Sequence, residues 1–144
     1  MTAIVGEGVT LRGIYDADSA ATWNLSGITQ TAAGAAAAVG MAVCQDTTAA
    51  NTAKLATAGA VILGSLLSAE VRVQEGITVG AVCRDGFFVW TYTGPDPILG
   101  QAVVGGATAG TVKGSLNVAD PVYVPGNVIV DIDTVNKLVT VLFD

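Results

Sequence analysis

The sequence feature that most constrains the fold is an alternating stretch at residues 71–92, with a turn dipeptide near its middle. Before the dipeptide, apolar residues recur at every second position from Val71 to Cys83 except at Glu75, which is typical of a strand with one buried face. Asp85-Gly86 suits a two-residue type I′ turn, because both central residues of that turn adopt positive φ. The stretch therefore predicts a long β-hairpin with these cross-strand pairs: Arg84 with Phe87, Cys83 with Phe88, Ala81 with Trp90 and Val79 with Tyr92.

This register places Phe88, Trp90 and Tyr92 on one face of the second strand. The residues opposite them are small, so this face has room for three large rings. We therefore expect the three aromatic side chains to lie in the hydrophobic core. The strand is predicted to end at Gly94-Pro95, because proline lacks a backbone donor.

Short apolar segments separated by turn residues recur through the rest of the chain. Their spacing of about 8–12 residues indicates an all-β fold, a single small β-barrel or sandwich built from antiparallel hairpins. The residues joining the last two strands include Asn136, which is suited to the left-handed conformation. The predicted strands are residues 9–15, 23–28, 40–44, 54–56, 60–67, 122–124, 128–132 and 138–143.

Two segments do not read as ordinary strands. Residues 1–8 hold Glu7 and apolar residues spaced by glycines but no core-sized side chain, so a first edge strand and an extended arm both remain open. The terminal position favours the arm, and we expect an extended N-terminal arm before a β-rich domain at residues 9–144. Residues 31–39 are rich in alanine but contain Gly34 and no large side chain, so a short helix and a loop both remain open.

One phrase of the sequence occurs twice. Residues 38–43 and residues 98–103 share the order apolar, glycine, any residue, alanine, valine. A turn-rich segment follows each copy, and then a short predicted strand that ends at Lys54 in the first case and Lys113 in the second. The repetition predicts two related β-units rather than a solenoid, which needs more copies.

The composition favours an assembly. The 144 residues are 51% hydrophobic and only 12% charged, whereas about 25% is usual for a soluble domain. Residues 60–67 are apolar on both faces, so we expect Val61, Leu63 and Leu66 to make subunit contacts.

Charge and targeting patterns exclude several partners. The net charge of −6 argues against binding to nucleic acid or to an anionic membrane. The uncharged residues 19–45 are too rich in alanine, glycine and polar side chains to span a bilayer. The first residues show no secretory signal, so we expect synthesis and folding in a cytoplasm.

The sequence offers little catalytic chemistry. It contains no histidine, which excludes Ser-His-Asp and Cys-His arrangements and most zinc sites. The best catalytic candidate is Asp46 in Asp46-Thr47-Thr48, since aspartic peptidases place a similar tripeptide on a turn after a strand. Thr48 replaces the glycine of that motif, so a structural turn held by the Asp46 side chain is the favoured interpretation.

Metal and cofactor sites are not expected. Asp131 and Asp133 share one face of a predicted strand, where a calcium ion is a weaker interpretation than a solvated edge. Cys44 and Cys83 lie in apolar stretches without metal-like spacing, so both are predicted to be small buried side chains and not a disulfide.

A series of phrases in this chain resembles the head decoration, or cement, proteins of tailed bacteriophages. The resemblance covers roughly residues 40–144, while residues 1–39 match nothing in that group. The phrases that carry it are Gly40-Met41-Ala42-Val43, residues 46–56, Leu63-Gly64, residues 72–76, Val79-Gly80, and the closing segments 127–133 and 139–142.

The resemblance implies a β-rich virion protein, commonly trimeric, that binds the major capsid protein on the capsid exterior and strengthens the shell. It brings no catalytic residue. For capsid contact we expect the N-terminal arm to serve, with Ile4 and Val5 as apolar anchors and Glu7 and Arg12 as charged partners. A glycan- or cell-surface-binding module of a fibre type and an acid-dyad peptidase using Asp46 are the alternatives.

Overall fold

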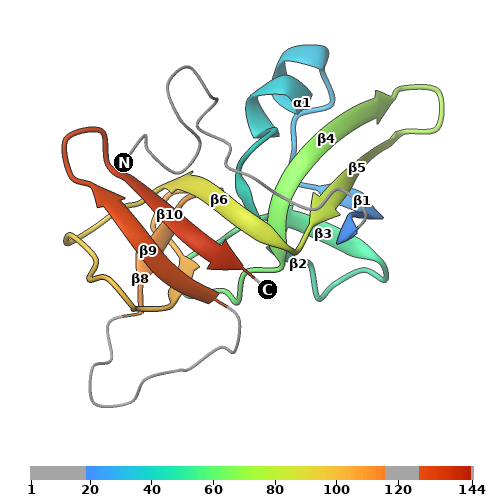
Figure 1. Ribbon diagram of the computed structural model, residues 1–144. Helices are drawn as coiled ribbons and strands as arrows, with labels where there is room; N and C mark the ends of the chain where they lie inside the picture. Colours follow the sequence, from blue (N-terminus) through green and yellow to red (C-terminus); the bar gives the residue numbers. More distant parts are fainter. Residues whose placement is uncertain (1–18, 116–126, 144) are drawn as a thin grey trace.

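The computed structural model describes residues 19–115 and 127–143, which form an all-β domain with one short helix. Ten strands divide into a five-stranded barrel, a three-stranded sheet and a two-stranded sheet (Figure 1). The barrel holds β1 (Ala21–Ser26), β2 (Ala42–Gln45), β3 (Thr52–Leu55), β4 (Gly64–Arg72) and β5 (Ile77–Cys83). The sheets hold β6 (Gly86–Thr91), β9 (Asn127–Asp133) and β10 (Leu138–Phe143), and β7 (Val103–Gly105) with β8 (Val112–Gly114).

The barrel closes through β1, which pairs parallel with β3 and antiparallel with β5. The strands approach closely because small residues stand at the crowded positions. Gly80 of β5 lies opposite Trp23, and a Cβ atom there would overlap the Ser68 carbonyl oxygen. The barrel core consists mainly of Leu25, Ile28, Ala38, Val43, Ala53, Leu66 and Val82.

The predicted hairpin over residues 71–92 is wrong, because β5 and β6 do not pair. The hairpin lies one turn earlier: β4 pairs with β5, with Arg72 opposite Ile77 and Gly76 at a φ of 69° in the turn. Residues 84 and 85 carry the chain out of the barrel, and β6 then pairs with β10. The chain therefore reverses at residues 73–76, between β4 and β5, and not at the predicted turn Asp85-Gly86.

Phe88, Trp90 and Tyr92 are nevertheless buried, as their alternation predicted. They face large partners from the three-stranded sheet and not the small residues of β5. The Phe88 and Trp90 rings stack with centroids 5.5 Å apart, and Phe143 meets the Trp90 ring edge-on at 6.2 Å. Ile129 of β9 and Val141 of β10 belong to the same core.

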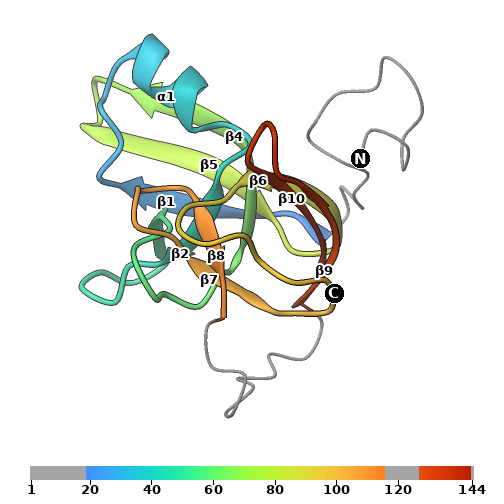
Figure 2. The same ribbon diagram turned by 90° about the vertical axis from the view of Figure 1, so that its left-hand side faces the viewer.

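The alanine-rich segment forms the short helix α1 (Ala32–Ala38). Thr31 caps its N-terminus, since its Oγ1 accepts a hydrogen bond from the Gly34 N–H at 3.0 Å. Ala35 and Ala38 are buried, and Figures 1 and 2 show α1 lying along β4. Its small side chains let this helix lie close to the barrel. Of the short helix and the loop that the sequence left open, the segment therefore forms the helix.

The repeated phrase adopts the same turn in both places. The Met41 N–H donates to the Ala38 carbonyl and the Gln101 N–H donates to the Ile98 carbonyl, each over 3.1 Å. The glycines of the two turns have φ values of 88° for Gly40 and 86° for Gly100, which glycine adopts without strain. A two-stranded hairpin follows each turn, β2–β3 and β7–β8, so the structure contains the two related β-units.

The closing hairpin β9–β10 also forms, but Lys137 and not Asn136 takes the left-handed conformation, with a φ of 57°. Of the predicted strand 60–67, only Gly64 onward belongs to β4. The predicted strands 9–15 and 122–124 and the arm at 1–8 lie outside the described residues. Among the residues that the structure describes, no helix has the length and apolar character needed to cross a membrane.

Candidate functional site

A cavity of about 350 Å³ lies beside β6 in the described part of the chain. One wall comes from the end of α1 and the turn after it, and the other from β6 and the start of β10. Most of the lining is apolar, and no ionisable side chain of the described residues contributes to it. The lining residues are Ala37, Val39, Gly40, Met41, Val89, Trp90, Thr91, Gly110, Thr111 and Leu138.

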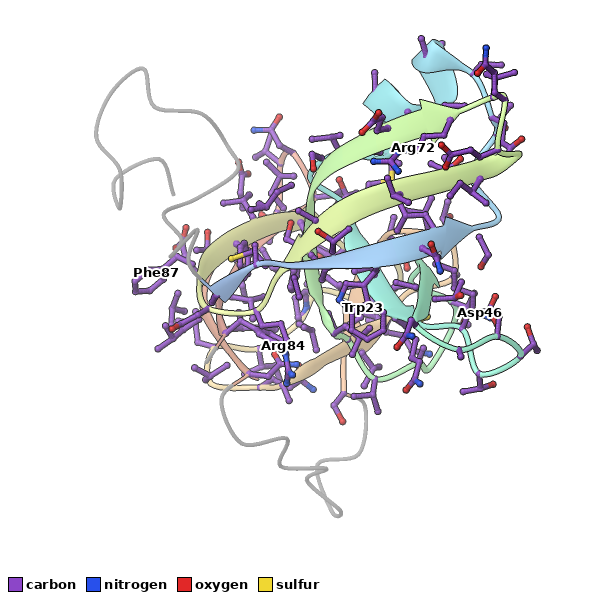
Figure 3. All side chains as sticks on the ribbon, turned by 90° about the vertical axis from the view of Figure 1, so that its right-hand side faces the viewer. Trp23, Asp46, Arg72, Arg84 and Phe87 are labelled. Atoms are coloured by element: carbon purple, nitrogen blue, oxygen red, sulfur yellow. The ribbon has the colours of Figure 1, made fainter. Side chains whose placement is uncertain are left out.

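The strand that borders this cavity stands at the end of its sheet. The three-stranded sheet has the order β6-β10-β9, so β6 has a paired edge toward β10 and a second edge toward the cavity. Just past the end of β6, Tyr92 on this second edge forms a parallel bridge with Val112 of β8. Phe87, near the start of β6, points away from the protein body in Figure 3. A strand edge of this kind beside an apolar cavity is a feature that binds extended chains rather than small polar substrates.

Asp46, the catalytic candidate of the sequence, forms a structural turn between β2 and β3 (Figure 3). Its Oδ1 accepts hydrogen bonds from the Thr48 N–H at 2.9 Å and the Thr48 hydroxyl at 2.6 Å. Its Oδ2 accepts the Ser26 hydroxyl of β1 at 2.6 Å, so the side chain ties the turn to the neighbouring strand. The prediction that the Asp46 side chain holds a structural turn is confirmed.

The same hydrogen bonds fix the ionisation of Asp46. The Ser26 and Thr48 hydroxyls and the Thr48 N–H lower the pKa of Asp46 to about 2, because they stabilise the carboxylate. An acid dyad needs a second carboxyl group that shares a proton with the first. Among the described residues, no carboxyl group is a hydrogen-bond partner of Asp46, and the partners that it has favour the charged form.

A second polar cluster, which the sequence did not predict, joins the end of β6 to the start of β10. The Tyr92 hydroxyl donates to Asp96 Oδ1 at 2.7 Å, and the Lys137 ammonium lies 3.2 Å from the same oxygen. Lys137 also stands over the Tyr92 ring, 5.4 Å from its centroid.

This cluster shifts the pKa of each of its members in a consistent direction. Hydrogen bonds from Tyr92 and Lys137 lower the pKa of Asp96, while the bond to Asp96 raises the pKa of both Tyr92 and Lys137. A phenol whose pKa is raised is less able to lose its proton and act as a nucleophile at neutral pH. The cluster therefore fastens the loop after β6 to β10.

One member of the acidic pair of β9, Asp133, has a structural role. Asp133 caps the β9–β10 turn, where its carboxylate accepts hydrogen bonds from the Val135 N–H, the Asn136 N–H and the Asn136 amide. These donors, led by Asn136, lower the pKa of Asp133. Across residues 19–115 and 127–143, no three side chains of the types that bind metals come together.

The remaining predicted residues have separate positions. Cys44 and Cys83 are buried and are not joined in a disulfide, as expected. Val61 is 63% exposed and Leu63 is half-buried, so both can reach a partner. The prediction for Leu66 is wrong: it is 0% exposed and belongs to the barrel core, because β4 turns that side chain inward. Ile4, Val5, Glu7 and Arg12 lie outside the described residues.

Exposed apolar side chains mark another part of the surface. Ile98 and Leu99 are each 62% exposed in the second of the two repeated turns. Hydrogen bonds between Gly100 and the Ile129 carbonyl and between the Ile129 N–H and Gln101 hold this turn against β9, one residue from the partly exposed Val130. We call Ile98, Leu99 and Val130 the apolar patch. The sequence signal for it was Ile98-Leu99 directly after a proline-rich turn.

This chain matches no protein-family model, no curated protein and no solved structure.

Proposed function

We propose that this chain is a structural protein that decorates the exterior of a bacteriophage capsid as a homotrimer. The proposal begins from the resemblance of residues 40–144 to phage decoration proteins. The observation that supports it most directly is the apolar patch, which leaves Ile98 and Leu99 in solvent in a chain with few charges. Such residues are stabilised when a partner covers them.

The polar chemistry of the described residues supports a structural role. Asp46, Asp96 and Asp133 each accept hydrogen bonds that hold a turn or a loop in place. The hydrogen bonds that they accept stabilise these carboxylates in the charged form. The alternative of an acid-dyad peptidase therefore has no support from the geometry around Asp46.

The decisive experiment measures capsid stability. Capsids that lack decoration are heated alone and with added protein, and release of packaged DNA is followed with an intercalating dye. We expect added protein to raise the release temperature and to co-sediment with the capsids. Failure to bind capsids, combined with binding to a glycan array or with peptide cleavage at low pH, would favour a rival function.

Matched variants test the surface. Ile98→Ser with Leu99→Ser removes the most exposed part of the apolar patch, and we expect this pair to weaken capsid binding. Val135→Ser is the control, because Val135 is 88% exposed at the tip of the β9–β10 turn, away from the patch residues. Equal binding by both variants would show that the patch is not the contact.

Two further measurements address the arm and the oligomer. Deletion of residues 2–8 should abolish capsid binding and leave the β-rich domain folded, because the arm precedes every described element. Light scattering at micromolar concentration should give the mass of a trimer. A monomer mass both in solution and on the capsid would contradict the trimer.

A further inference from the structure

A small pocket of about 110 Å³ lies between the loop after β6 and strand β8. Pro95, Pro97 and Ile98 give it apolar walls, and Lys113 of β8 also lines it. Lys113 is half-buried, so its charge is partly withdrawn from water at this position. We call the hollow formed by these four residues the proline pocket.

The walls of the proline pocket are fixed by bonds within the loop. The Ile98 N–H donates to Gln101 Oε1 at 3.1 Å, and Gln101 Nε2 donates to the Ser115 carbonyl. A Cβ atom on Gly114 would overlap the Gln101 amide, so this side chain packs directly against β8. The two prolines have a fixed φ. A pocket with fixed walls loses little conformational entropy when a partner fills it.

The proline pocket has one positive charge in excess. Asp96 lines it as well, but the Lys137 ammonium lies 3.2 Å from Asp96 Oδ1, so these two charges balance. Among the described residues, the ammonium group of Lys113 has no hydrogen-bond or ion-pair partner. A partly desolvated ammonium group attracts a carboxylate more strongly than a fully exposed one does. The pocket therefore favours an acidic side chain beside an apolar one.

The turn between β4 and β5 presents such a pair of side chains. Val73 is 75% exposed, and the Glu75 side chain is 59% exposed. Glu70 and Glu75 both lie near the single guanidinium group of Arg72, at 3.6 Å and 3.7 Å, so the turn has one negative charge in excess. We call residues 70–77 the hairpin tip. Its charge is opposite to that of the proline pocket.

The hairpin tip has a defined shape and lies far from the proline pocket of its own chain. The Glu75 N–H donates to the Arg72 carbonyl at 3.1 Å, and the Gln30 amide donates to the Gly76 carbonyl at 2.9 Å. Figure 1 shows the β4–β5 turn at the upper right of the domain and β8 at the lower left. The tip therefore meets a proline pocket only on another copy.

We propose that the hairpin tip of one copy docks into the proline pocket of a second copy, with Glu75 paired to Lys113 and Val73 packed against the prolines. The contact joins two different surfaces, so it is head-to-tail and can close into a ring. This inference rests on the homotrimer of the proposed function and names the contact between its copies. Leu99 and Val130 of the apolar patch do not line the pocket and stay available to the capsid.

Charge reversal of the full-length chain tests the pairing by sedimentation equilibrium. Lys113→Glu places a carboxylate opposite Glu75, so the concentration needed for half-assembly should rise at least about tenfold. Glu75→Lys should have a similar effect. The chain that carries both substitutions restores an opposite-charge pair, and we expect its assembly to return to within about threefold of the wild type. A folding defect in a single variant would not be repaired in this way.

Two controls make the comparison specific. Arg84→Glu has the same change of charge as Lys113→Glu, but Arg84 is exposed and does not line the pocket, so assembly should not change. Val73→Ser should raise the half-assembly concentration at least about threefold. Val135→Ser, in the exposed turn between β9 and β10, should leave it unchanged.

Cross-linking tests the head-to-tail geometry. Glu75→Cys and Lys113→Cys chains are mixed and treated with a short thiol-reactive linker, while the native Cys44 and Cys83 are buried. We expect linked dimers in the mixture and none with either variant alone. Equal cross-linking within one variant would contradict a head-to-tail contact.

The outcomes separate this contact from the proposed function. Wild-type assembly in both single charge variants, or no recovery in the double variant, would overturn the contact and leave capsid decoration in place. A wild type that stays monomeric up to roughly 100 µM would also overturn the contact. Charge-dependent assembly of a protein that binds no capsid would support the contact and refute decoration alone.

Discussion

The indole Nε1–H of Trp90 donates a hydrogen bond to the Ser65 hydroxyl over 3.3 Å, and both side chains are buried. Trp90 belongs to β6 and Ser65 to β4, so this bond joins the three-stranded sheet to the barrel. The barrel and the three-stranded sheet are also joined by the chain itself, which passes from one to the other at residues 84 and 85. Strands on both sides must hold a common orientation for the cavity beside β6 to exist.

We expect Ser65→Ala to lower the free energy of unfolding by about 1–3 kcal/mol, because it leaves the buried indole N–H without a partner. Urea denaturation measures the change. Trp90→Phe completes a double-mutant cycle, since it removes the donor. Ser65→Ala should cost less in the Trp90→Phe background, and additive effects of the two substitutions would show that the hydrogen bond contributes nothing to stability.

Local patterns predicted those features of the fold that depend on nearby residues. The return of Lys54 and Leu55 against β2, the burial of the β6 aromatics and the repeated turn at Gly40 and Gly100 all follow from alternation and turn chemistry within short segments. The all-β class follows from the same signals. A helix at residues 32–38 remained open because alanine alone does not say what the helix packs against.

The long hairpin was mispredicted for a different reason. The turn at residues 73–76 and the dipeptide Asp85-Gly86 are both good turn sequences, and local propensity does not choose between them. Close packing makes the choice, because the Gly64 backbone lies against the Cys83 carbonyl and so places β4 beside β5. That contact joins residues far apart in the sequence, which a periodicity argument does not detect.

The candidate site was also invisible to local patterns. Asp96 and Lys137 are 41 positions apart, and the cavity beside β6 combines residues from α1, β6 and β10. Of these polar groups, only the turn at Asp46 could be predicted from the sequence, because its partner Thr48 lies two residues away. The contact of Ser26 with Asp46 could not be predicted, because it arises only through the parallel pairing of β1 with β3.

Two glycine substitutions should differ strongly in cost. A Cβ atom at Gly64 would overlap the Cys83 carbonyl oxygen inside the barrel, so we expect Gly64→Ala to lower the free energy of unfolding by about 3 kcal/mol or more. Gly100→Ala meets no described atom within 4 Å but must adopt a φ of 86°, which costs about 1–2 kcal/mol. Thermal denaturation of both variants gives the comparison, and a larger loss for Gly100→Ala would contradict the packing at Gly64.

Asn127 substitutes for a strand partner at the edge of β7. Its Oδ1 accepts the Val103 N–H at 3.3 Å and its Nδ2 donates to the Val103 carbonyl at 3.0 Å, in a buried position. Asn127→Ala removes both of these hydrogen bonds, so unfolding should become easier by about 1–3 kcal/mol. Faster exchange of the Val103 amide would locate the effect, and an unchanged Val103 amide would show that water or another group replaces the side chain.

Asp46 should make the stability of the protein depend on pH in the acid range. Its pKa is about 2 in the folded chain, against an ordinary value of 3.8 for an aspartate side chain. Between these two values the unfolded chain therefore binds more protons than the folded chain. Stability contributed by the carboxylate is fully present above about pH 4 and is lost as the pH falls toward about 2. Below that range both states are protonated, and the contribution no longer changes.

The measurement is the midpoint of urea unfolding between about pH 5 and about pH 2 for the wild type and for Asp46→Asn. Asp96 and Asp133, whose pKa values are also lowered, contribute to the acid sensitivity of both proteins, so the difference between the two curves isolates Asp46. We expect Asp46→Asn to be less stable at the upper end of this range and the two curves to converge at the lower end. Ser26→Ala removes one donor to the carboxylate and should give an intermediate curve. Parallel curves for all three proteins would mean that the Ser26 and Thr48 hydrogen bonds do not favour the charged form of Asp46.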